Sequence, residues 1–161
     1  MQQQKTDKEA CQRNLDEVFE LLGKEHKAAL QMCQIIREGI RSEISFQRIK
    51  KYADWYYKNQ LAPHLKKERA YVFPILGEES ELIKKTLAKQ RRLKRLFNEE
   101  REIEKSLNRI EEELEGLIRL NEKKIFKEIA LRATEDQLIE IKKAYQNAPE
   151  TKVWNDVFWH E

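Results

Sequence analysis

Apolar side chains recur at the helical period of 3.6 residues along almost the whole chain, and few helix breakers interrupt them. The 161 residues include only four glycines and three prolines, while 38% are charged and 40% are hydrophobic. An apolar stripe with charged residues on the other faces is the pattern of an amphipathic helix that packs against neighbours. A chain of this length is typical of one domain with its own core. The sequence therefore predicts a single all-α domain over residues 1–161.

Capping residues and helix breakers divide the first half of this pattern into two long helices. The first is expected over residues 14–39, with the polar residues 1–13 flexible. Ser42 or Ser45 offers a side-chain oxygen that can cap the second helix. Pro63 falls inside that second helix, where a proline kinks or divides the helix because it lacks a backbone N–H.

Similar signals divide the second half into two more long helices and a short fifth one. Ser80 is placed to begin the third helix, and Asn98, followed by two glutamates, to cap the fourth. Thr134 and Gln137 form a capping box for a fifth helix that ends near Tyr145. Four amphipathic helices with short connections favour an up-down-up-down antiparallel four-helix bundle.

The C-terminal segment, residues 146–161, has no helical period but is rich in aromatic residues. Trp154, Phe158 and Trp159 make this segment too apolar for a free chain end. We expect the tail to pack on the bundle, with a contact between two copies of the chain as the alternative.

Each long helix also places at least one polar residue on its apolar stripe. These residues are His26, Gln60, His64, Glu68, Gln90 and Asn121. Gln60, His64 and Glu68 follow one another at intervals of four, which puts them on one helix face. A buried polar group without a partner costs about 1–3 kcal/mol, so these groups should meet one another or a bound ligand. The pattern predicts a polar site inside the bundle.

Two interpretations of that site follow from its chemistry. Two histidines and one carboxylate form a known ligand set for non-haem iron and for catalytic zinc. The residues His26, His64 and Glu68 could therefore hold one Fe or Zn ion. A di-metal carboxylate centre needs a larger set of His, Asp and Glu ligands, and the amides of this site are poor ligands. The other interpretation is a hydrogen-bonded polar core without a cofactor.

Several stretches resemble the hemerythrin-like, or HHE cation-binding, domain family. The stretches that resemble its four helices are, in order, GKEHKAALQMCQIIREGI, YYKNQLAPHLKKERAYVFPILG, TLAKQRRLKRLF and LEGLIRLNEKKIFKEI. The closing VWNDVFWHE is similar to a tail found in one branch of the family. The resemblance extends over residues 22–159 and implies a hemerythrin-like helical bundle.

Carried over position by position, the resemblance implies that most of the family's metal ligands have been replaced. His26, His64 and Glu68 keep the ligand chemistry. Other residues stand at ligand positions: Gln60, Ser80, Gln90 and Leu117 where the family has or often has histidine, and Asn121 where it has glutamate. The resemblance therefore implies a non-catalytic binding or regulatory module whose di-iron site is largely lost. The alternative is a single-metal protein with a role in oxygen or redox sensing.

Charge and cysteine content limit the other function classes. The 32 basic and 29 acidic residues give a net charge of +3, and acidic runs follow the basic run at 89–95, so no nucleic-acid surface is expected. No apolar run is long enough to span a membrane, and the polar N-terminus is unlike a signal peptide. Cys11 and Cys33 are lone thiols, which suits the cytoplasm. No catalytic motif is present, and a protein partner or a homodimer stays open.

Overall fold

The structure, a computed structural model, describes residues 2–146 and 152–160, and every regular element within them is helical. In chain order the elements are α1 (Gln2–Arg41), α2 (Phe46–Tyr56), the π-helical turn η1 (Tyr57–Leu61), α3 (Ala62–Lys67), the π-helical turn η2 (Glu68–Val72), the 3-10 turn η3 (Phe73–Ile75), α4 (Glu81–Phe97), α5 (Ile103–Leu120), the π-helical turn η4 (Asn121–Ile125), α6 (Phe126–Arg132), α7 (Glu135–Gln146) and the 3-10 turn η5 (Phe158–His160). The predicted all-α helical bundle is confirmed.

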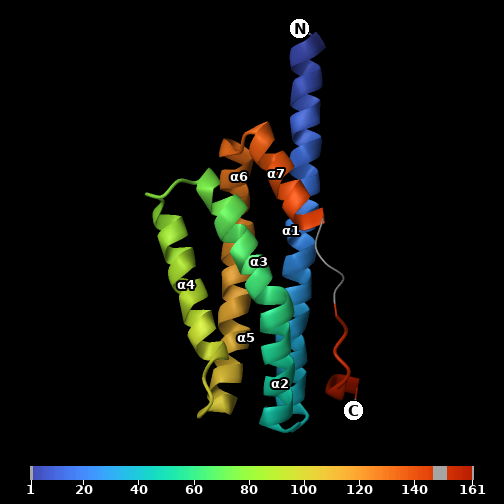
Figure 1. The fold of residues 1–161 in the computed structure, drawn as a ribbon, viewed down its shortest axis with the longest axis vertical. Helices are drawn as coiled ribbons and strands as arrows, with labels where there is room; N and C mark the ends of the chain where they lie inside the picture. Colours follow the sequence, from blue (N-terminus) through green and yellow to red (C-terminus); the bar gives the residue numbers. More distant parts are fainter. Residues whose placement is uncertain (1, 147–151, 161) are drawn as a thin grey trace.

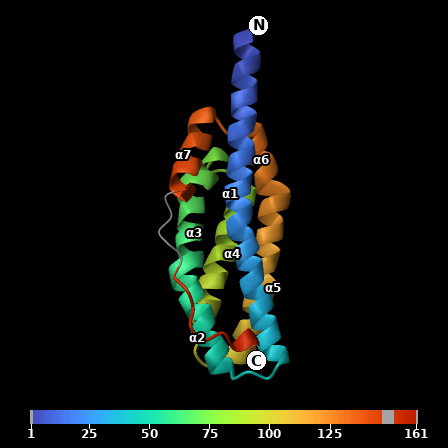
Figure 2. The same ribbon diagram turned by 90° about the vertical axis from the view of Figure 1, so that its right-hand side faces the viewer.

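Four long helical segments form the bundle, and two of them are interrupted by π-helical turns (Figure 1). Helix α1 is one segment and α4 another. The second runs from α2 through η1 and α3 into η2, and the fourth runs from α5 through η4 into α6. The short helix α7 packs against α1, as Figure 2 shows from the side. No helix among the described residues is both long and apolar enough to cross a membrane.

Helix α1 begins at Gln2, so the expected start at residue 14 is wrong. The first turns are exposed, and they extend beyond the rest of the bundle in Figures 1 and 2. Side-chain hydrogen bonds one turn apart support them, from Gln3 to Asp7 at 3.3 Å and from Gln12 to Asp16 at 2.9 Å. The stretch has no apolar stripe to signal a helix, but it also has no glycine or proline to end one.

The capping residues of two later helices act as the sequence predicts. Ser80 caps α4, because its Oγ accepts a hydrogen bond from the backbone N–H of Ile83 at 3.3 Å. Thr134 and Gln137 make a reciprocal capping box before α7. The backbone N–H of Gln137 donates to Thr134 Oγ1 at 3.2 Å, and the N–H of Thr134 donates to Gln137 Oε1 at 2.9 Å.

The predicted cap of the fourth helix is wrong. Asn98 ends α4 in a helical conformation, and α5 begins only at Ile103 after Glu102. Glu99 stabilises the turn between the two helices, because its Oε1 accepts a hydrogen bond from the backbone N–H of Arg101 at 2.9 Å. The acidic residues after Asn98 therefore belong to the connection and not to the first turn of a helix.

The apolar core consists of two clusters at different levels of the bundle. The α2-side cluster contains buried residues such as Met32, Ile36, Ile49, Leu93 and Leu114. The α7-side cluster contains buried residues such as Val18, Leu22, Val72, Ile125 and Ile141. All long segments contribute to both clusters, so each segment passes from one to the other at mid-length.

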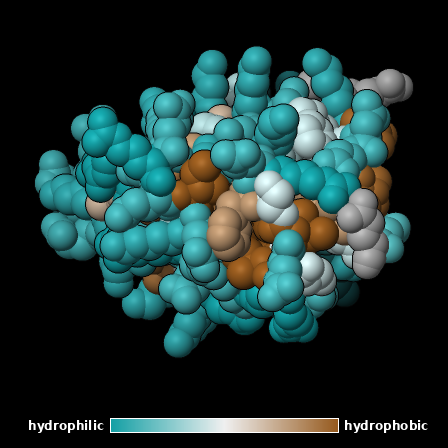
Figure 3. All heavy atoms as spheres, turned by 90° about the horizontal axis from the view of Figure 1, so that it is seen from below, coloured by the Kyte–Doolittle hydropathy of each residue, from teal (hydrophilic) through white to brown (hydrophobic). Residues whose placement is uncertain are grey.

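The aromatic residues of the C-terminal segment, Trp154, Phe158 and Trp159, lie on the α2-side cluster. Phe158 is buried against Tyr52, with ring centroids 5.8 Å apart, and Trp154 packs on Trp55 at 5.4 Å. Figure 3 views this end of the molecule, where apolar side chains form a patch within a mostly hydrophilic surface. Phe46, the first residue of α2, stays 37% exposed. The part of the predicted tail at 147–151 lies outside the described residues.

Gly39 gives a test of how closely the tail is fitted to α1. A Cβ atom at this position would lie 2.9 Å from Ile49 Cδ1 and 2.9 Å from Phe158 Cε2, and both side chains are fully buried. We expect Gly39→Ala to lower the free energy of unfolding by about 1–3 kcal/mol, measured by urea denaturation.

Gly23, in the same helix, is the matched control because a Cβ there meets nothing within 4 Å. Gly23→Ala should raise stability by about 0.5–1 kcal/mol. Equal unfolding midpoints for the two variants would contradict the tight fit at Gly39.

Candidate metal centre

A layer of polar residues lies between the two apolar clusters. Its members come from all four long segments: His26 from α1, His64 from α3, Glu68 from η2, Gln90 from α4 and Asn121 from η4. All five are buried. On each segment the layer lies between residues of the α7-side cluster and residues of the α2-side cluster. On α1, for example, His26 lies between Leu22 of the first cluster and Ala29 of the second. Five of the six predicted polar residues therefore meet at one level.

Two π-helical turns begin within this layer. Glu68 is the first residue of η2 and Asn121 is the first residue of η4. In each turn the backbone carbonyl of the first residue accepts from the N–H five residues later, at Phe73 and Phe126. Single π-helical turns inside α-helices occur frequently at functional sites.

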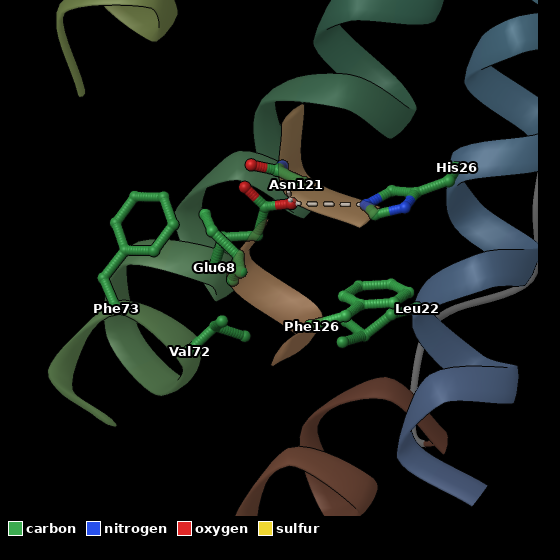
Figure 4. A pocket seen from close by; sticks show the side chains of 8 residues that line it. Leu22, His26, Glu68, Val72, Phe73, Asn121 and Phe126 are labelled. Carbon is green, nitrogen blue, oxygen red and sulfur yellow. Dashed lines mark hydrogen bonds and ion pairs between the residues drawn. The ribbon is translucent and has the colours of Figure 1, made fainter. Parts of the chain in front are cut away.

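Glu68 is the centre of the layer, and its side chain is contacted from three other segments. His64 Nε2 lies 2.7 Å from Glu68 Oε1, and Asn121 Nδ2 donates to the same oxygen at 3.4 Å. Gln90 Nε2 donates to Oε2 at 3.2 Å. His26 Nε2 faces Oε1 at 3.6 Å, the contact drawn as a dashed line in Figure 4. That distance is too long for a hydrogen bond.

Two further carboxylates, which the sequence analysis did not single out, hold the outer nitrogens of the histidines. His64 Nδ1 is hydrogen-bonded to Glu25 Oε2, and His26 Nδ1 lies 3.1 Å from Glu122 Oε1. The side chains of Glu25 and Glu122 are 29% and 44% exposed. Glu25 directly precedes His26 and Glu122 directly follows Asn121, so adjacency to a predicted site residue was the one available signal.

The buried His64–Glu68 pair is charged. Burial alone would lower the pKa of His64, but the carboxylates of Glu68 and Glu25 reverse this and raise it to about 10. Burial alone would raise the pKa of Glu68, but the charge of His64, its hydrogen bond and the nearby ring of His26 lower it to about 2.

Gln60 and Leu117 do not contribute polar groups to this layer. Gln60 lies half-buried in η1, and no hydrogen bond in the described structure joins it to Glu68 or the histidines. The π-helical turn η1 changes the number of residues per turn, so the interval of four no longer keeps Gln60 on the face of His64. Leu117 is 1% exposed and packs within the α2-side cluster.

The donor atoms fit one metal ion. A nitrogen from each of His26 and His64 and a carboxylate oxygen of Glu68 lie within 4.8 Å of one another. Ligand atoms on one ion at about 2.1 Å are about 3.0–4.2 Å apart, so a small contraction would suffice. Two buried atoms here, His26 Nε2 and Asn121 Oδ1, make no hydrogen bond. Both residues line a cavity of about 10 Å³, which is space for one water.

The same residues do not fit a di-iron centre. A second ion would need further histidine or carboxylate ligands from α4 and α5, and those segments supply the amide of Gln90 and the aliphatic Leu117. Among residues 2–146 and 152–160, His26, His64 and Glu68 form the one group of three or more His, Cys, Asp or Glu side chains close enough to share a metal ion.

The fold and this site together define a helical-bundle protein with a buried histidine–carboxylate cluster suited to a cation. The family model described as the hemerythrin HHE cation binding domain matches residues 17–140. The chain belongs to the hemerythrin HHE cation-binding domain family. No curated protein and no solved structure matched the chain.

The pKa directions of the central pair give a pH dependence for the metal-free protein. The raised pKa of His64 means that its contribution to stability is complete below about pH 6.5 and is lost as the pH rises through about 10. Glu68→Gln removes one partner of this buried pair, which should cost about 3–5 kcal/mol near pH 6. The difference in urea unfolding midpoint between wild type and variant should narrow between pH 6 and pH 10. A constant difference over that range would contradict the charged pair.

Cys33 lies outside the polar layer, in the α2-side cluster. Burial raises the pKa of its thiol to about 12, and the nearby Glu111 adds to the effect. We expect a thiol reagent to label the half-buried Cys11 in the native protein and Cys33 only after unfolding. Cys11→Ser isolates the second thiol for this measurement, and rapid native labelling of that variant would contradict the prediction.

Proposed function

We propose that this domain binds a single divalent transition-metal ion, Fe or Zn, through His26, His64 and Glu68. In this proposal the domain is a non-catalytic binding or regulatory module and not a di-iron oxygen carrier. The observation that carries the proposal is the unpaired Nε2 of His26, which is buried and faces the Glu68 carboxylate.

The hydrogen bonding of His26 supports a cation at this position. Its Nδ1 lies beside the carboxylate of Glu122 and therefore carries a hydrogen. In the neutral ring this leaves a lone pair on Nε2, directed toward an anion 3.6 Å away. An unsatisfied buried acceptor costs about 1–3 kcal/mol. A metal ion between His26 Nε2 and Glu68 Oε1 would remove that cost, because an imidazole nitrogen and a carboxylate oxygen can both coordinate a metal.

The surroundings determine what the site can do with a bound ion. An iron ion here would supply redox chemistry and a zinc ion Lewis acidity. The apolar side chains of Leu22, Val72, Phe73 and Phe126 line the cavity next to Glu68 and restrict the access of water (Figure 4). A site with so little space admits only very small ligands, which suits a sensing role better than turnover of an organic substrate.

A metal-free polar core is the second candidate, and the bonding of His64 favours it. This ring has a carboxylate partner on each nitrogen, and Glu68 accepts hydrogen bonds on both oxygens. The buried polar atoms of this network have hydrogen-bond partners without a metal, except for His26 Nε2 and Asn121 Oδ1. In this case the polar layer would serve to hold the four segments in register inside a binding module.

Metal titration separates the two candidates. Untagged protein, stripped with a chelator, is titrated with Zn²⁺ and anaerobically with Fe²⁺, and bound metal is measured by elemental analysis. We expect one ion per chain for wild type and for the control Gln60→Ala, which alters a residue outside the polar layer. His26→Ala and Glu68→Ala should lose the ion while keeping the helical circular dichroism signal.

The stoichiometry has distinct consequences. Two ions per chain would contradict the single-metal proposal. No ion in the wild type would reject metal binding and leave the polar core as the function of these residues.

A further inference from the structure

We infer that Glu25 and Glu122 are positioning residues that hold the two site histidines with Nε2 toward Glu68. Their role in metal binding depends on the function proposed above, whereas their role in orienting the rings does not. Both histidines use Nδ1 for a partially exposed carboxylate and Nε2 for the buried one. The same arrangement thus occurs twice, with different residues.

Each of these hydrogen bonds crosses from one helical segment to another. Glu25 is next to His26 on α1, yet it holds His64 of α3. Glu122 is next to Asn121 in η4, yet it holds His26 of α1. Neighbouring residues on a helix point in different directions, so a glutamate beside a buried residue can reach the ring on the adjacent segment. The two glutamates consequently lie at the outer side of the polar layer, and their hydrogen bonds prevent the histidine rings from rotating.

The positions of the glutamates suit an orienting role. Both carboxylates are partly exposed, so water solvates their negative charge and no buried cation is needed to balance it. Glu25 is itself held by Lys67, whose Nζ lies 3.7 Å from its Oε1. Lys67 in turn lies over the ring of Tyr145 at 4.9 Å, and that ring packs edge-on to His64 with centroids 5.8 Å apart. Lys67 therefore holds Glu25 by charge, and Tyr145 holds the ring of His64 by packing.

A histidine whose outer N–H is bound to a carboxylate is a better metal ligand for two reasons. The hydrogen bond fixes which nitrogen is free, and the nearby negative charge makes that nitrogen more basic. Loss of such an outer partner typically costs 10–100-fold in metal affinity. We expect Glu25→Ala and Glu122→Ala each to weaken Zn²⁺ binding within this range, and the corresponding Gln variants to weaken it less because the amide oxygen still accepts.

The decisive experiment is imidazole NMR of ¹⁵N-labelled, metal-free protein. The wild type should show hydrogen-bonded Nδ1–H signals for both His26 and His64. Glu122→Ala should remove the His26 signal alone, Glu25→Ala the His64 signal alone, and each Gln variant should retain its signal. Glu128→Ala is the matched control, since Glu128 pairs with Arg132 on α6 outside the polar layer. It should leave both signals and the Zn²⁺ affinity unchanged.

The outcomes separate this inference from the proposed function. Unchanged Nδ1–H signals in both Ala variants would overturn the positioning role, whether or not the protein binds metal. A wild type that binds no Zn²⁺ but loses the signals as expected would overturn the metal function and keep the positioning role. Selective loss of each signal, together with weaker Zn²⁺ binding, would support both.

Discussion

A single buried carboxylate organises this molecule. Glu68 is 2% exposed, and an isolated charge at that depth would cost several kcal/mol. Its compensation comes from His64 on its own segment and from His26, Gln90 and Asn121 on the three others. The four long segments therefore meet at one side chain, and their relative positions along the bundle are tied to it. Apolar packing alone would fix the positions of the segments along the bundle less strictly, because apolar contacts are not directional.

The polar layer and the apolar packing are separate parts of this bundle. The two apolar clusters supply most of the burial, and they lie on either side of the layer. The amides of Gln90 and Asn121 supply hydrogen bonds within the layer and belong to neither cluster. Leu117, one helical turn before Asn121, instead belongs to the α2-side cluster. The composition of the polar layer can therefore vary without loss of the apolar scaffold.

Much of the fold and part of the site could be predicted from the sequence. Apolar periodicity gave the helices, and the capping box at Thr134 gave the start of α7, because these are local interactions. Gln60 was misplaced because helical spacing assumes 3.6 residues per turn and the π-helical turn η1 does not obey it. Glu25 and Glu122 were missed because their role depends on rings that belong to other segments. Such contacts between segments leave no periodic signal in a sequence.

The π-helical turns that begin at Glu68 and Asn121 have a consequence for how such sites diverge. Each contains one residue more per turn than an α-helix, which is equivalent to a one-residue insertion. Deletion of one residue within η2 or η4 would rotate the later side chains of that segment by about 100° relative to Glu68 or Asn121. The polar residue and the apolar residues after it, such as Val72 or Ile125, would then no longer face the bundle interior together, so a single deletion could disrupt the site with every ligand residue still present in the sequence. Comparison of ligand identities alone would miss that change.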